Sequence, residues 1–140
     1  MSVPGEYAPS PEAWVREEVA HYERTGTGHK GRPVIVLATR GARTGLLRKT
    51  PLMRVEHAGS YAAVASMAGA AQHPAWYRNA LADPQVTLQD GLTVHLLLAR
   101  ELTGAERSRW WSRACGVFAS YADYQSATDR QIPVLLLEPR

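Results

Sequence analysis

Residues 33–53 constrain the fold more than any other stretch, because a glycine-punctuated turn separates two strand-like runs there. Residues 33–40 form a largely continuous apolar run rich in β-branched side chains, a pattern typical of a buried strand. The turn that follows contains Gly41 and Gly45, and a second strand is expected at residues 48–56. The stretch therefore predicts a β-hairpin.

The rest of the chain adds further strand signals. Asp90-Gly91 is a strong hairpin signal between two strand-like runs. No stretch shows the regular alternation of strands and helices that doubly wound sheets require. About six mainly antiparallel strands, interrupted by two or three peripheral helices, therefore predict an α+β fold built on a small barrel. Besides the first two, strands are expected at residues 60–66, 86–89, 93–101 and 132–138.

Helix starts are marked at three places. Ser10-Pro11-Glu12 combines a capping residue, a proline and an acid, and it predicts a helix that ends within residues 25–28. A second helix is expected at residues 73–82, where Asp83-Pro84 stops it. Thr103-Gly-Ala-Glu106 has the spacing of a capping box and predicts a third helix.

Composition indicates an ordinary globular protein. The chain has 140 residues, of which 45% are hydrophobic and 21% charged. Residues 1–30 are expected to form a lead-in and an amphipathic helix, and residues 31–140 the β-barrel domain. No apolar run approaches the ~18 residues that span a bilayer, and no secretory signal is visible. We therefore expect a cytoplasmic protein with at most peripheral membrane contact.

Several classes of site are excluded by residue type and spacing. The single cysteine, Cys115, excludes an internal disulfide and a cysteine-based zinc site. The five histidines show no metal-ligand spacing, so no metal is expected. The order of serine, histidine and aspartate needed for acyl transfer is missing, as are the glycine motifs of classical dinucleotide and nucleoside triphosphate sites.

The first hairpin lies in a zone with one sign of charge. From residue 30 to residue 54 there are seven cations and no acid, while charges elsewhere are mixed. Clustered Arg and Lys beside turn N–H groups are suited to a phosphate or carboxylate ligand. Nucleic acid is not expected, because this zone contains no aromatic residue on which a base could stack. The cations are Lys30, Arg32, Arg40, Arg43, Arg48, Lys49 and Arg54.

Five segments occur in the order found in one known family, and they are residues 41–53, 64–67, 73–79, 121–126 and 128–133. On these segments the chain closely resembles the deazaflavin-dependent nitroreductase family, small reductases that use 8-hydroxy-5-deazaflavin (coenzyme F420). The similarity runs from about Arg32 to Pro139. It implies a split β-barrel fold, related to that of oxidases that bind flavin mononucleotide (FMN).

The resemblance also implies which residues bind the cofactor. The segment 42–44 and the second strand match the part of the family that holds the phosphate and acidic tail, and Arg43, Arg48 and Lys49 are residue types that such a polyanionic tail needs. Residues 64–67 match the segment beside the deazaflavin ring. The implied cofactor-binding residues are Ala42, Arg43, Thr44, Arg48, Lys49, Thr50, Pro51, Leu52, Met53, Val64, Ala65, Ser66, Met67, Ala75, Trp76, Tyr77, Arg78, Asn79 and Tyr121.

Three residues are implied to be catalytic: Ser66, Tyr121 and Tyr124. The two tyrosines are three apart and share a face if their stretch is helical. A phenol there would hydrogen-bond a developing oxyanion or donate a proton. Met67 and Phe118 stand where a well-known member of the family has lysine and tyrosine, and both lie on the acceptor side.

The expected activity is hydride transfer from the reduced deazaflavin to quinones, with nitroaromatics or activated enones as further acceptors. Two alternatives stay open. In one, the protein binds FMN, as its barrel relatives do; in the other, it carries the deazaflavin without catalysis. A homodimer is a further expectation, because split barrels of this kind often dimerise.

Overall fold

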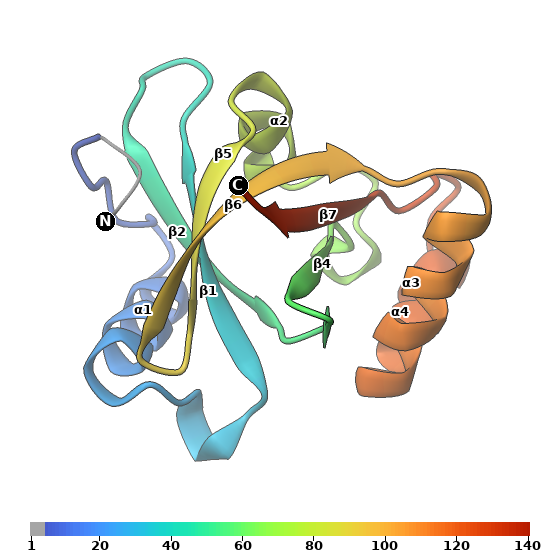
Figure 1. Cartoon of the computed structure of the whole chain (residues 1–140), viewed down its shortest axis with the longest axis horizontal. Helices are drawn as coiled ribbons and strands as arrows, with labels where there is room; N and C mark the ends of the chain where they lie inside the picture. The colour runs from blue at the N-terminus through green and yellow to red at the C-terminus, as the bar shows by residue number, and fades with distance from the viewer. Residues whose placement is uncertain (1–4) are drawn as a thin grey trace.

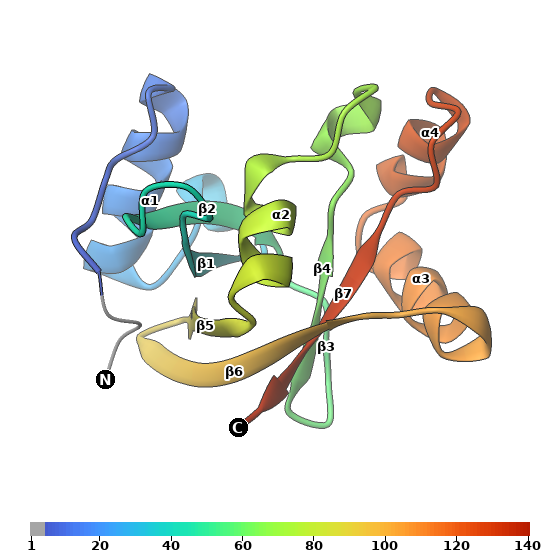
Figure 2. The ribbon, with the colours of Figure 1, turned by 90° about the horizontal axis from the view of Figure 1, so that it is seen from above.

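The computed structural model describes residues 5–140; residues 1–4 of the expected lead-in lie outside the described residues. The chain folds into one curled antiparallel sheet with helices around it, in the strand order β2-β1-β5-β6-β7-β4-β3 (Figures 1 and 2). The predicted α+β fold is confirmed. The strands are β1 (Val34–Arg40), β2 (Leu47–Met53), β3 (Glu56–His57), β4 (Ser60–Val64), β5 (Gln85–Asp90), β6 (Thr93–Glu101) and β7 (Val134–Pro139).

Within residues 5–140 the sheet has seven strands, so the predicted number of about six was wrong. The difference arises within the expected strand 48–56. Its first part, β2, pairs with β1 from Arg40↔Leu47 to Val34↔Met53. Beyond Met53 the chain leaves β1, and residues 56–57 pair instead with β4. One expected strand is therefore two strands at opposite ends of the sheet order.

Both predicted hairpins are present. β1 and β2 are joined by the turn at residues 41–46, and β5 and β6 are joined through Asp90-Gly91, with Gly91 in the left-handed region at φ 63°. β2 and β4 come within contact distance but are not paired with each other. The barrel is therefore split between these two strands.

Both faces of β1 and β7 are covered, which explains why these two strands are apolar without alternation. Leu135 and Leu137 of β7 face the barrel interior, where Trp76 and Ala80 also pack. The neighbouring Leu136 belongs to a second cluster on the opposite face. The helices are α1 (Ala13–Thr25), α2 (Ala75–Ala82), α3 (Gly104–Val117) and α4 (Ser120–Ser126), with short 3₁₀ turns η1 (His29–Gly31) and η2 (Met67–Gly69).

Two expected helix starts differ in detail. α1 begins at Ala13 and not at Pro11, because Glu12 has extended backbone and its N–H donates to Ser10 Oγ at 3.2 Å. The predicted capping box before α3 is not formed. The Glu106 carboxylate is held instead by the Arg100 guanidinium, at 2.9 and 2.7 Å. Within residues 5–140 no helix has the length and apolar character needed to cross a bilayer.

Candidate active site

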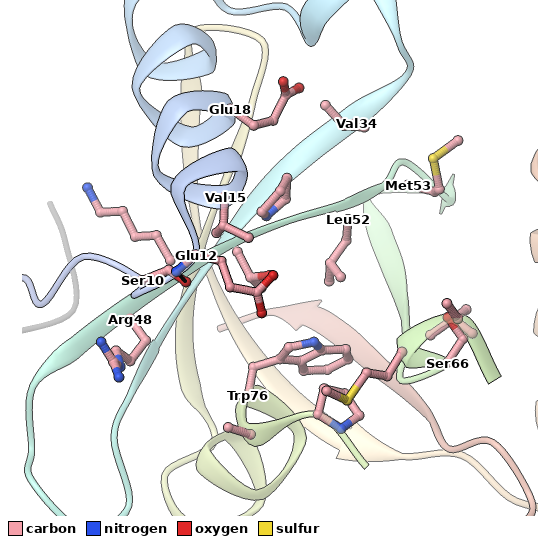
Figure 3. Close-up of a pocket in the computed structure, with 18 of the residues that line it drawn as sticks. Ser10, Glu12, Val15, Glu18, Val34, Arg48, Leu52, Met53, Ser66 and Trp76 are labelled. Carbon is pink, nitrogen blue, oxygen red and sulfur yellow. Dashed lines mark hydrogen bonds between the residues drawn. The ribbon is translucent and has the colours of Figure 1, made fainter. Parts of the chain in front are cut away.

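A cavity of about 710 Å³ lies where the barrel is split. β2 forms one wall, the end of β4 and η2 form another, α2 lies at the base, and the N-terminal segment with α1 covers the side (Figure 3). β2 runs along the cavity from Arg48 to Met53, a span of roughly 16 Å at the usual strand rise. Figure 3 shows Arg48 and Ser66 on opposite sides of this space. The cavity is therefore elongated, with different residue types at its two ends.

The cationic end is formed by Arg48 and Lys49 of β2. The Arg48 guanidinium donates to the carbonyl oxygens of Ala8 and Pro9, at 3.0 and 3.2 Å. The Lys49 ammonium pairs with the Glu23 carboxylate at 2.5 Å and lies 4.6 Å from the centre of the Tyr7 ring. The N-terminal segment therefore supplies the present partners of both cations.

The turn between β1 and β2 is tied to α2. The N–H of Ala42 donates to Asn79 Oδ1 at 3.0 Å, and Asn79 is buried in the cavity wall. Within the turn, Thr44 Oγ1 accepts from the N–H of Leu46 at 3.1 Å. Arg43 is exposed at the tip of this turn and does not line the cavity. The turn is therefore fixed, with Arg43 directed to solvent.

The opposite end of the cavity is bounded by the loop that follows β4. Ser66 is buried and lines the cavity, and Met67 and Ala68 after it have φ values of 46° and 53°. Left-handed backbone is unfavourable for non-glycine residues and persists only where the surroundings enforce it. This loop is therefore held in a specific conformation beside Ser66.

Three aromatic residues close the same end. The ring centres of Tyr121 and Tyr124 are 6.4 Å apart at an interplanar angle of 73°, which confirms that α4 places both on one side. Phe118 packs edge-on against Tyr121 at 5.1 Å. Burial, followed by the neighbouring Tyr124 and Cys115, raises the pKa of Tyr121 well above its usual range. Tyr121 therefore keeps its proton near neutral pH, and its side chain lines the cavity.

The structure brings most of the implied site residues to this one cavity, although their roles stay predictions. Ala65 is fully buried beside it, and the Tyr77 hydroxyl points elsewhere, donating to Glu101 at 2.6 Å. The implied residues that do not line the cavity are Ala42, Arg43, Thr44, Ala65, Tyr77 and Arg78. Those that line it are Arg48, Lys49, Thr50, Pro51, Leu52, Met53, Val64, Ser66, Met67, Ala75, Trp76, Asn79, Tyr121 and Tyr124.

The sequence interpretation missed the contribution of the N-terminal segment to the lining. Val15 and Glu18 of α1 reach the cavity, as do Ser10 and Glu12 before the helix (Figure 3). The apolar face of α1 signalled that the helix packs on the protein. It carried no information about which strand the helix covers.

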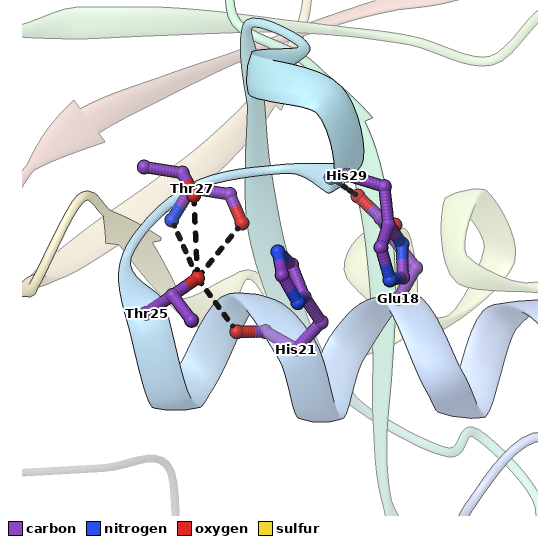
Figure 4. A network of polar contacts seen from close by, with 5 residues as sticks. All are labelled: Glu18, His21, Thr25, Thr27 and His29. Atoms are coloured by element: carbon purple, nitrogen blue, oxygen red, sulfur yellow. Dashed lines mark hydrogen bonds and ion pairs between the residues drawn. The ribbon is translucent and has the colours of Figure 1, made fainter.

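A polar network holds α1 beside the cavity (Figure 4). The buried Glu18 carboxylate accepts from the backbone N–H of His29 at 3.2 Å and also contacts the His29 ring. The His21 ring stacks on that of His29, with centres 4.1 Å apart and an angle of 18°. At the end of the helix, the Thr25 hydroxyl donates to the carbonyl of His21 at 2.8 Å. The helix and the η1 turn are therefore joined as one unit.

Comparison with known proteins identifies close relatives of this chain. The model of the F420H(2)-dependent quinone reductase family matches residues 14–139. An F420H(2)-dependent quinone reductase of Mycobacterium tuberculosis strain H37Rv is 33% identical over 111 residues, which are 77% of this chain and 74% of that protein.

Two solved structures are more similar still. One is an F420-H2 dependent reductase, FDR-A, with 49% identity and a TM-score of 0.73 over 76% of this chain and 95% of that one. The other is described as a domain-swapped dimer, with 46% identity and a TM-score of 0.75 over 92% of this chain and 100% of that one.

Proposed function

The chain belongs to the F420H(2)-dependent quinone reductase family, and we propose that it reduces quinones with hydride from reduced coenzyme F420. The observation that carries this proposal is the cavity at the split of the barrel. Its cationic end at Arg48 and its other end at Ser66 lie on opposite sides of a single space, and β2 runs along that space. This division matches a cofactor that combines a polyanionic tail with a flat redox-active ring.

The residues of the cavity fit the cofactor. Arg48 and Lys49 provide a guanidinium fork and an ammonium for the phosphodiester and glutamate carboxylates of the tail. Ser66 and Met67 lie in a loop of small residues that a planar ring can approach closely. The two lining carboxylates have partners of their own: Glu18 contacts His29, and Glu12 accepts from Trp14 Nε1 at 2.7 Å.

When bound, the reduced deazaflavin supplies a hydride to an acceptor beside it, and the protein contributes binding, orientation and a proton source. A quinone that accepts a hydride becomes a hydroquinone anion, which needs one proton. Tyr121 lines the cavity, where it could hydrogen-bond that oxygen and pass it a proton that water then replaces. Burial raises its pKa, so the phenol starts from its protonated form. Ser66 would orient the acceptor, and Tyr124 would cover its exposed face.

Finer assignments are part of the same proposal. Nitroaromatics and activated enones are further acceptors, since they too accept hydride and a proton. Residues 31–140 are proposed as the reductase domain and residues 1–30 as a lead-in and amphipathic helix, in a cytoplasmic protein with at most peripheral membrane contact. The relative described as a domain-swapped dimer supports a homodimer here as well.

The test is stopped-flow mixing of the protein and reduced coenzyme F420 with menadione, followed by the absorbance of the oxidised deazaflavin. Multiple turnovers well above the protein-free rate are expected. If the cofactor binds and no acceleration occurs, the protein is a carrier and the reductase proposal is wrong. Equilibrium dialysis against FMN, run in parallel, tests the other cofactor.

A further inference from the structure

Arg130 lies between α4 and β7 and binds the loop that carries Ser66. Its guanidinium donates to the carbonyl oxygens of Ala65 at 3.1 Å, Ser66 at 2.7 Å and Ala70 at 2.8 Å. A fourth contact joins Arg130 Nη1 to His73 Nδ1 at 2.9 Å. One side chain therefore holds both ends of the loop and His73, two residues before α2.

The loop needs such a support. Its residues Met67, Ala68 and Gly69 all have positive φ, at 46°, 53° and 80°. A single non-glycine residue in this region costs of the order of 1 kcal/mol or more, so the loop would relax without external bonds. The three carbonyl groups that Arg130 binds flank this left-handed run on both sides.

The same arginine is anchored to the helix that carries the tyrosines. The Gln125 side chain donates to the carbonyl of Arg130 at 2.8 Å and accepts from the N–H of Ile132 at 2.9 Å. Gly69 approaches α4 closely as well, because a Cβ at that position would lie 2.9 Å from the carbonyl oxygen of Tyr124. The Ser66 loop and α4 are therefore joined at two points.

We propose that Arg130 is a positioning residue for the reductase reaction, which sets the distance between Ser66 and the Tyr121–Tyr124 pair. This inference rests on the proposed function. Arg130 touches neither tyrosine ring and does not line the cavity, so it acts only through the loop and α4. The side-chain contacts of Arg130 all lie at the Ser66 end, away from Arg48, where the proposed function places the cofactor tail.

Lysine cannot replace arginine in this role. The bound oxygens lie around a planar fork, and an ammonium has its three donors on one nitrogen. Arg130→Lys would therefore keep the charge and lose some of the four bonds. A displacement of about 1 Å at a reacting centre can lower turnover by about 100-fold.

The test compares Arg130→Lys and Arg130→Gln with Arg109→Gln, which changes an exposed arginine on α3. We expect both Arg130 variants to lose about 10- to 100-fold in kcat per bound cofactor, and to weaken the binding of oxidised cofactor by less than that, because the ring lies along the loop while the tail binds at the Arg48 end. Arg109→Gln should match wild type in both. Wild-type kcat per bound cofactor in the Arg130 variants, even with a lowered Tm, would overturn the positioning role.

A second measurement separates this inference from the proposed function. Amide hydrogen exchange across residues 65–70 should rise at least about tenfold in Arg130→Lys, with exchange in α3 unchanged. Unchanged exchange in the loop overturns the inference even if the wild-type protein does not reduce menadione. If the wild-type protein does not reduce menadione, the proposed function is overturned and the inference about Arg130 and the loop is not. If neither Arg130 variant folds, Gln125→Ala replaces them, with the same direction expected for exchange and kcat because it removes both bonds to the 130–132 backbone.

Discussion

The salt bridge between Lys49 and Glu23 gives a prediction about cofactor affinity. The two charged groups are 2.5 Å apart, and their side chains are 21% and 38% exposed. If Lys49 binds the acidic tail of the cofactor, the Glu23 carboxylate competes for the same ammonium. We therefore expect Glu23→Gln to bind the cofactor more tightly than wild type, because the glutamine keeps the side-chain shape and removes the competing charge.

The size of the effect follows from the exposure of the pair. Ion pairs this accessible to water contribute about 0.2–1 kcal/mol, since solvent and salt screen them. If binding must break the pair, removing it in advance lowers Kd by about 1.5- to 5-fold. Loss of the ion pair should also weaken the docking of α1 on β2, by no more than about 1 kcal/mol.

The assay is fluorescence titration of oxidised coenzyme F420 at low and at high salt. Glu17→Gln is the matched control, because Glu17 is an exposed acid on the same helix and makes no contact with Lys49. Both variants remove one negative charge from α1. They differ in that only Glu23 pairs with the Lys49 ammonium. Equal affinities for the two variants, or weaker binding by Glu23→Gln, would refute the assignment of Lys49 to the tail.

Three further predictions concern single residues. Lys49→Ala should weaken cofactor binding by roughly 10-fold or more, because it removes a charge-assisted hydrogen bond. Lys30→Ala, which changes an exposed lysine, should leave the affinity unchanged, and titration at fixed salt compares the two variants. Tyr121→Phe should lower kcat for menadione by about 100-fold with cofactor affinity unchanged, because the ring stays and only the proton donor is lost; stopped-flow kinetics measures this. Burial, followed by the charge of Arg130, lowers the pKa of His73 from its usual 6.5, against a smaller opposing effect of Glu101, with Arg78 and the Tyr77 ring also close to it. As pH falls, the unfolded chain therefore takes up the proton before the folded protein does. The stability that His73 contributes is complete above pH 6.5 and is lost as pH falls toward the lowered pKa. Urea unfolding from pH 8 to pH 5 should show a smaller loss of unfolding free energy for His73→Gln than for wild type.

Hairpins were predictable from the sequence because their signals are local. Asp90-Gly91 contains the residue types that a tight turn needs, and the apolar run before Gly41 ends where the β1–β2 turn begins. The break after Met53 was not predictable in the same way. Residues 54–57 continue a strand-like pattern, and only the competition between β1 and β4 for partners decides where pairing changes.

Contacts made through the backbone were harder to predict than those between side chains. Arg130 lies in a segment that was recognised, yet three of its four partners are carbonyl oxygens, which any residue provides. The docking of α1 is similar, because Val15 and Val19 pack on β1, a strand whose apolar residues face both sides of the sheet. A pattern of residue types cannot indicate a partner that is backbone, or choose between two equally apolar faces.

The two ends of the cavity are built from different interactions, and this predicts how they respond to perturbation. Arg48 is exposed and Lys49 is only partly buried, so salt screens their attraction for an anionic tail. At physiological ionic strength the screening length is about 8 Å. The loop at Ser66 is fixed by short hydrogen bonds to a half-buried guanidinium, and bulk ions have little access to those bonds. Affinity should therefore fall as salt rises while the rate of the bound complex stays constant. A rate that fell in parallel with affinity would mean that the cations also organise the reacting end.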